Sequence, residues 1–139
     1  MKGAADDPIV EIDEKIAAGM ISASEIARGR DYWRDHLQDG VRLPTGETAT
    51  ITWRGLHHIL DDGRLRAEPE LMIQILRQVV EIRTERSDRR VALSYWIANG
   101  QPRWGYAILS PSGHVITMHY TRERTVKQFQ RRGSLLWTR

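Results

Sequence analysis

The sequence contains no cysteine and no long run of apolar residues. Without cysteine, disulfide bonds, thiolate zinc sites and cysteine nucleophiles are all excluded. A helix that crosses a bilayer needs about 20 mostly apolar residues in a row, so the sequence predicts no membrane span and no membrane partner. The first seven residues also lack the apolar stretch of a secretory signal. We therefore expect the protein in the cytoplasm, either of its own cell or of a target cell into which it is delivered.

Lysine is scarce in the second part of the chain, where Lys127 is the only one between residues 51 and 139. That part carries 15 lysine and arginine residues against 8 acidic ones, a balance of +7, whereas residues 1–50 carry 6 against 10, a balance of −4. Arginine holds phosphate through a fork of donors. An arginine-rich C-terminal part thus indicates a polyanionic partner, although a solvated arginine-rich surface would have the same composition.

Length and composition are those of one globular domain. The chain has 139 residues, of which 40% are hydrophobic and 28% charged, enough to bury a core without disulfides or metals. We see no internal repeat and no low-complexity segment. We expect a single domain over residues 1–139, with a helical N-terminal extension (1–50), an α+β core (51–125) and a basic tail (126–139).

Apolar spacing predicts helices in the first part of the chain. Isoleucine and methionine recur at helical intervals over residues 8–20. Ser22 and Glu25 have the spacing of a capping box, which begins a second helix over residues 23–38. Residues 40–50 read as a loop. Thr52 is a candidate N-cap for a third helix that ends at Leu60.

The hydrophobic period changes from helical to alternating further along. Glu68-Pro69-Glu70 begins a fourth helix, whose apolar stripe continues to Ile82. From Arg90 onward, alternation predicts three strands near residues 91–97, 104–110 and 115–120. Asn99-Gly100 is a strong hairpin signal, and the chain end from Arg122 is expected as a short helix or an extended arm. The predicted fold class is α+β, with N-terminal helices followed by a small antiparallel β-sheet meander.

The third predicted strand carries chemically useful side chains on one face. Ile116, Met118 and Tyr120 should point toward a core under the helices. Val115, Thr117 and His119 should point the other way. Thr117 and His119 would lie about 7 Å apart, which is close enough for both to touch one phosphate group. A half-exposed strand face with ordinary polar residues is the alternative interpretation.

His57 and His58 are neighbours on the third predicted helix. Consecutive helical residues lie about 100° apart, so His57 falls at the edge of the apolar stripe and His58 is freer to meet a substrate. The alternative is a packed His57 and a merely solvated His58. The pair lacks the i, i+4 spacing of two metal ligands on one helix face, so we expect no metal site and no cofactor.

RNA cleavage without a metal needs a base for the 2′-hydroxyl, an acid for the leaving oxygen and donors for the phosphate oxygens. Histidine can serve the first two roles, and arginine, threonine and tyrosine the third. The catalytic candidates are His57, His58, Thr117 and His119. The substrate-binding candidates are Arg103, Trp104, Tyr120 and Arg122. Trp104 could stack on a base or belong to the core.

The stretch from Leu56 to Tyr120 resembles the barnase–EndoU–colicin–RelE superfamily of small ribonucleases, in particular its phage-associated and polymorphic-toxin branches. The resemblance rests on His58-Ile59, on the helix that Glu68-Pro69-Glu70 begins, and on Val115-Ile116-Thr117-Met118-His119-Tyr120. It implies a helix with a His-Ile pair, then a four-stranded antiparallel sheet with a late strand bearing a threonine and a tyrosine. By this resemblance His58 is the catalytic histidine and Thr117 the late-strand hydroxyl. Several relatives use a lysine for phosphate; here Arg103 would take its place.

Two classes of function follow from these features. The first is a metal-independent endoribonuclease of the toxin or effector type that cleaves a structured RNA such as tRNA or rRNA, with an immunity or antitoxin protein as a further partner. The second is a non-catalytic phage-associated binding module or regulator of the same fold. A DNA-binding protein is disfavoured because the second helix is acidic and no helix-turn-helix is evident.

Overall fold

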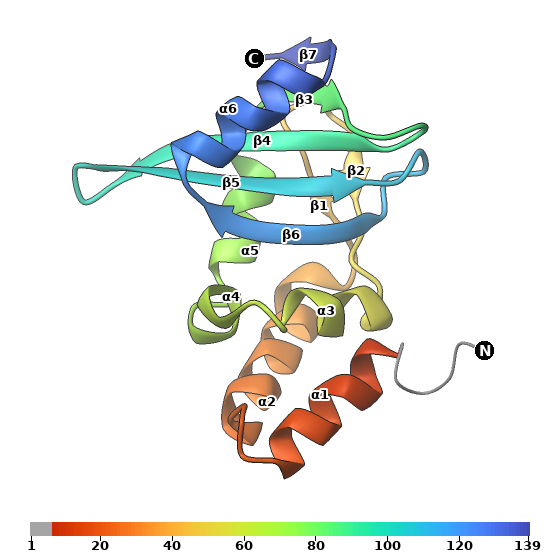
Figure 1. Ribbon diagram of the computed structural model, residues 1–139, viewed down its shortest axis with the longest axis vertical. Helices are drawn as coiled ribbons and strands as arrows, with labels where there is room; N and C mark the ends of the chain where they lie inside the picture. The colour runs from red at the N-terminus through yellow and green to blue at the C-terminus, as the bar shows by residue number, and fades with distance from the viewer. Residues whose placement is uncertain (1–6) are drawn as a thin grey trace.

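A computed structural model describes residues 7–139. The predicted α+β class is confirmed: helices come first along the chain, and a five-stranded antiparallel sheet follows (Figure 1). A separate two-stranded sheet lies within the helical part of the chain, at residues 41–49. None of the helices within residues 7–139 is long and apolar enough to cross a membrane.

The two N-terminal helices begin at side-chain caps. Helix α1 (Pro8–Ala17) follows Asp7, whose carboxylate accepts the N–H of Ile9 at 2.9 Å. Helix α2 (Ala23–Tyr32) follows Ser22, whose hydroxyl accepts the N–H of Glu25 as the capping box predicted. It continues directly into a π-helical turn, η2 (Trp33–Leu37). The predicted second helix thus lies where it was expected.

Residues 40–50 are not a plain loop, as the sequence had indicated, but contain a small hairpin. Strands β1 (Val41–Arg42) and β2 (Thr48–Ala49) pair antiparallel. Val41 and Leu43 are buried in the main core together with Ala49. Burial of these side chains stabilises an element too short to be recognised by periodicity.

Two short helices follow, and the first begins where predicted. Helix α3 (Trp53–Ile59) starts after Thr52, whose hydroxyl accepts the N–H of Gly55 at 3.0 Å. Helix α4 (Gly63–Ala67) was not predicted, and Asp62 is its N-cap. The buried side chain of Leu65 holds α4 against the core.

The fourth predicted helix is shorter than expected. Helix α5 covers Leu71–Arg77, and strand β3 (Val79–Thr84) begins two residues later. Val79 and Ile82 are buried, but from the strand and not from a helical stripe. The two positions are three residues apart, which is a helical spacing, and both are buried from the strand because its pairing with β4 shifts register between Val79 and Glu81. β-Branched residues favour the strand once β4 offers hydrogen-bond partners.

The large sheet is antiparallel throughout, in the order β6-β5-β4-β3-β7. Its remaining strands are β4 (Arg90–Ala98), β5 (Gln101–Leu109), β6 (Val115–Thr121) and β7 (Leu135–Thr138). Asn99 and Gly100 both have positive φ, 52° and 74°, so the predicted two-residue hairpin turn is confirmed. The chain end forms both a helix, α6 (Glu123–Arg132), and an edge strand, since β7 pairs with β3.

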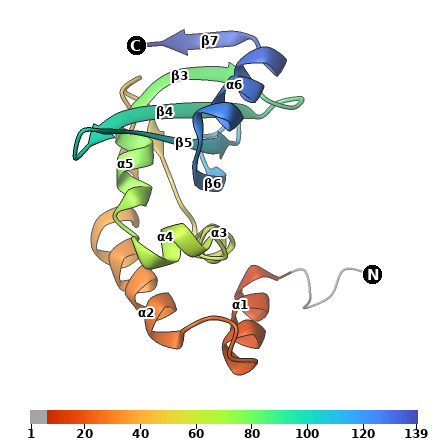
Figure 2. The same ribbon diagram turned by 60° about the vertical axis from the view of Figure 1, so that its left-hand side comes forward.

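Helices cover both faces of the sheet (Figures 1 and 2). Helix α5 lies on one face, over the main core that also includes residues of α1 to α4. Helix α6 crosses the other face, where Val126 packs against a smaller apolar cluster. That cluster contains Val91, Leu93 and Ile108. The α6 face is the one that carries His119.

The strand-face prediction is wrong at the first two residues of the strand, Val115 and Ile116. Met118 is in the main core as expected, but Ile116 packs with the α6-side cluster and Val115 packs with the main core. The cause is a register shift, because Leu109 pairs with Val115 while Ile108 pairs with Thr117. The extra residue reverses the alternation before Thr117 and leaves it intact after that point.

Gly105 is the point of closest approach between β5 and α5. A Cβ at this position would lie 2.6 Å from Cγ1 of Ile75. We expect Gly105→Ala to lower the free energy of unfolding by about 1–3 kcal/mol through overpacking, as measured by urea denaturation. The loss should be smaller in an Ile75→Ala background, which removes the clashing atoms. Equal losses in both backgrounds would show that this contact is not the cause.

Candidate active site

His119 is held between two side chains on the α6 face of β6. Its Nδ1 lies 2.7 Å from Oδ2 of Asp62, and its Nε2 lies 3.2 Å from Oγ1 of Thr117. Thr117 and His119 are two positions apart on one strand, so strand geometry places them side by side, as the sequence predicted. The hydrogen-bonded chain from Asp62 through His119 to Thr117 is the centre of the candidate site.

The carboxylate of Asp62 caps α4 and contacts His119, and these hydrogen bonds favour its ionised form. Its Oδ1 accepts the N–H groups of Arg64 at 2.8 Å and Leu65 at 3.2 Å, which caps α4. Burial by itself would raise the pKa of Asp62, but the hydrogen bond with His119 and the two backbone N–H groups outweigh it and hold this pKa below its ordinary value.

The ionised carboxylate of Asp62 sets the tautomer of His119. A carboxylate can only accept hydrogen bonds, so the proton between the two residues belongs to Nδ1 of the imidazole. In the neutral ring, Nε2 is then an acceptor with its lone pair toward Thr117. His119 is 39% exposed. A substrate hydroxyl that displaced Thr117 would therefore meet a base that is already oriented.

Tyr106 lies beside His119 on the neighbouring strand. The two residues are directly paired between β5 and β6, and their ring centroids are 5.3 Å apart. Burial raises the pKa of Tyr106, and the negative charge of Asp62 raises it further. Phe129 of α6 contacts the same ring, at 4.8 Å between centroids. Tyr106 thus keeps its proton and is held between the site and α6.

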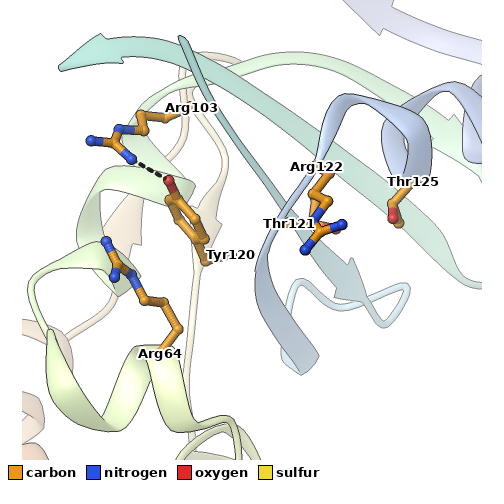
Figure 3. Close-up of a pocket in the computed structure, with 6 residues that line it drawn as sticks. All are labelled: Arg64, Arg103, Tyr120, Thr121, Arg122 and Thr125. Carbon is orange, nitrogen blue, oxygen red and sulfur yellow. Dashed lines mark hydrogen bonds between the residues drawn. The ribbon is translucent and has the colours of Figure 1, made fainter. Parts of the chain in front are cut away.

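A basic hollow of ≈ 500 Å³ lies at the C-terminal end of β6 (Figure 3). Nη1 of Arg103 donates to the hydroxyl of Tyr120 at 2.8 Å. The guanidinium of Arg64 lies over the ring of the same tyrosine, 5.0 Å from its centroid, and its Nη2 pairs with Glu68 at 3.0 Å. The remaining lining residues are Thr121, Arg122 and Thr125.

The hydrogen-bonded chain and the hollow draw on the same two short segments of the sequence. Residues 62–64 supply Asp62 and Arg64, and residues 119–122 supply His119 and the β6 part of the lining. Three of the predicted substrate-binding residues, Arg103, Tyr120 and Arg122, line this hollow. A phosphodiester could be held by guanidinium groups next to an oriented imidazole.

The fourth predicted substrate-binding residue, Trp104, lies on the α6 face, next to Tyr106 along the strand. It is partly buried against the smaller apolar cluster, and its ring lies 5.6 Å from that of Tyr95. The sequence left both a core and a base-stacking role open. The structure places Trp104 against the smaller cluster as a half-buried residue.

Neither histidine of α3 is hydrogen-bonded to this centre. His57 has no exposed surface; its Nδ1 contacts the carbonyl of Trp53 at 2.7 Å and its Nε2 accepts from Nε of Arg30 at 2.9 Å. Burial lowers its pKa, so it is a neutral packing residue and we leave it out of the candidate site. His58 is exposed and lines a different hollow of ≈ 330 Å³, with Val115 and Ile116.

Comparison of the chain with protein-family models, curated proteins and solved structures gives no match. Within residues 7–139, no group of three or more histidine, aspartate and glutamate side chains is placed to hold a metal ion.

Sequence reasoning missed Asp62 and Arg64. Asp61-Asp62-Gly63 read only as the end of a helix, yet aspartate is also a favoured first residue of the next one. That signal could have predicted α4 and its cap. The partner of the remaining carboxylate oxygen, His119, lies 57 positions away and has no local signal.

The lowered pKa of Asp62 predicts a pH-dependent contribution to stability. A group whose pKa is depressed by folding stabilises the protein above its unfolded pKa of about 3.9, and this contribution is lost as the pH falls further. Asp62→Asn keeps a capping side chain but removes the charge. We expect it to cost about 1 kcal/mol at pH 7, since His119 is partly solvated, and less at pH 3. Denaturant titrations at both values measure this difference; an equal cost at both would contradict it.

Proposed function

We propose that the protein is a metal-independent endoribonuclease. The observation that carries this proposal is the imidazole of His119, oriented by Asp62 and followed directly in the chain by residues that line an arginine-rich hollow. In the chain, helix α5 is followed by the four-stranded meander β3 to β6. The ribonuclease resemblance implies the same succession of a helix and four antiparallel strands, which supports the proposal.

His119 would act as the general base. Its Nε2 takes the proton of a ribose 2′-hydroxyl, the 2′-oxygen attacks the adjacent phosphorus, and the bond to the 5′-oxygen breaks. The products are a 2′,3′-cyclic phosphate and a 5′-hydroxyl end. Asp62 stabilises the imidazolium that forms. The leaving oxygen needs a proton, for which the hydroxyl of Tyr106 is a protonated group on the same face.

The basic hollow would hold the phosphate. Arg103 and Arg122 offer guanidinium donors to its oxygens, and Arg64 adds positive charge from α4. The exposed part of Trp104 would stack on a base. We expect a structured RNA such as tRNA or rRNA as substrate, and an immunity or antitoxin protein as the partner of a toxin of this type.

A non-catalytic binding module is the second candidate, and one contact favours it. The Nε2 atom of His119 already has a protein partner in Thr117. If this bond persists with ligand bound, the same surface holds RNA or protein without cleaving it.

Incubation of the protein with total tRNA and rRNA in EDTA tests the activity. We expect discrete fragments on a denaturing gel, and a loss of about 10²–10⁴-fold in rate for His119→Gln. His58→Gln is the matched control and should retain activity, because His58 lines a different hollow. Circular dichroism checks that both variants fold.

Each contrary result has a distinct meaning. Activity lost in His58→Gln and kept in His119→Gln would move the site to α3, as the resemblance implies. Intact RNA at every concentration of the wild-type protein would favour the binding module.

Arg103 tests the phosphate-holding role. Arg103→Lys keeps the positive charge but loses the planar fork of donors. We expect the cleavage rate to fall about tenfold. Tyr120→Phe is the control for the lost contact to the tyrosine hydroxyl, and should cost less. Equal losses in the two variants would mean that Arg103 acts only by positioning Tyr120.

A further inference from the structure

Helix α6 presents basic side chains that have no acidic partner. Arg124, Arg131 and Arg132 are exposed, and no carboxylate of residues 7–139 lies within 4.0 Å of their charged atoms. The single acid of α6, Glu123, is already paired with Lys127 at 2.9 Å. Most arginines of the helical region, such as Arg34 and Arg66, do have carboxylate neighbours.

The exposed basic residues of α6 form one stripe. Arg124, Gln128, Arg131 and Arg132 line a shallow hollow of ≈ 350 Å³ on the outside of the helix. Their spacing of three and four residues keeps them on one helix face. The N-cap residue of the same helix, Arg122, and Thr125 of its first turn line the basic hollow at the end of β6. One helix of ten residues, about 15 Å long, therefore joins the two hollows.

We propose that the outer face of α6 binds the phosphate backbone of the RNA beyond the nucleotide that reacts. This inference rests on the proposed function for the identity of the polyanion, but uses residues outside the candidate active site. The strand would leave the hollow at Arg122 and follow the stripe toward Arg132. At this length, α6 contacts two or three further phosphates, so the protein binds long RNA more tightly than short oligonucleotides.

A lipid surface is the other polyanion that a basic amphipathic helix can bind, but the packing of α6 argues against it. Membrane association of this kind needs an apolar face free to enter the bilayer. The apolar residues of α6 are already used: Val126 is buried, and Phe129 contacts Tyr106 on the sheet. Only the polar face is available to a partner.

The test measures binding separately from cleavage. Fluorescence anisotropy with a 2′-O-methyl RNA of 20 nucleotides, which lacks the attacking hydroxyl, is recorded over a range of salt concentrations. The variant is Arg124→Gln/Arg132→Gln. The control is Arg34→Gln/Arg86→Gln, which removes the same charge from exposed arginines that are 61% and 78% accessible and lie outside α6.

We expect the α6 variant to bind the 20-mer about tenfold more weakly than the wild-type protein. The slope of log affinity against log salt should fall by about 1.4, as expected for two lost single-strand phosphate contacts. The control variant should bind with near wild-type affinity and slope. Affinity for a dinucleotide should not change in either variant.

Three other outcomes are decisive. Equal weakening in both variants would overturn the proposal, because only net charge would then matter. Binding to vesicles with anionic lipid, but not to RNA, would overturn it in favour of a membrane surface. Binding through α6 by a wild-type protein that never cleaves RNA would support the α6 proposal and remove the proposed catalytic function.

Discussion

The hydrogen bond between His119 and Asp62 connects the two parts of the molecule on which the candidate site depends. Asp62 caps α4 with one carboxylate oxygen and holds the imidazole with the other. The bond thereby fixes the turn between α3 and α4 against β6, a strand at the edge of the sheet. Because α4 is placed in this way, Arg64 lies over Tyr120 and enters the basic hollow. One carboxylate determines both the tautomer of the base and the position of a cation beside it.

The edge position of β6 explains how side chains from both faces of the sheet reach one site. His119 and Tyr106 belong to the α6 face, whereas Tyr120 packs toward the main core. In the middle of a sheet these residues would be separated by the neighbouring strands. At an edge, α4 approaches from one side and α6 from the other, and a ligand can contact both sets. Phe129 adds a direct contact between α6 and the ring beside the imidazole.

The arginines of the helical region differ from those around the basic hollow and along α6 in their partners. In the helical region, arginines such as Arg28, Arg34 and Arg66 have carboxylate or backbone partners, which suits a surface with a structural role. Around the basic hollow and along α6, several guanidinium groups face solvent without a carboxylate neighbour within residues 7–139. Like charges held close together repel each other and reduce stability unless a polyanion neutralises them. This arrangement, more than the net charge of +3, favours a phosphate-rich partner.

The sequence by itself determined the features that depend on adjacent residues. Caps at Ser22 and Thr52, and the turn at Asn99-Gly100, could be predicted because a side chain or a backbone torsion acts within three or four positions. Alternation likewise predicted that Thr117 and His119 share a face. Tertiary structure alone decided where α5 ends, because Val79 and Ile82 continue the helical spacing and are buried from a strand only through the register shift against β4. It also decided the face of Ile116 and the pairing of His119 with Asp62, 57 positions away. Contacts of that range depend on the packing of every element between the two residues, which no local pattern encodes.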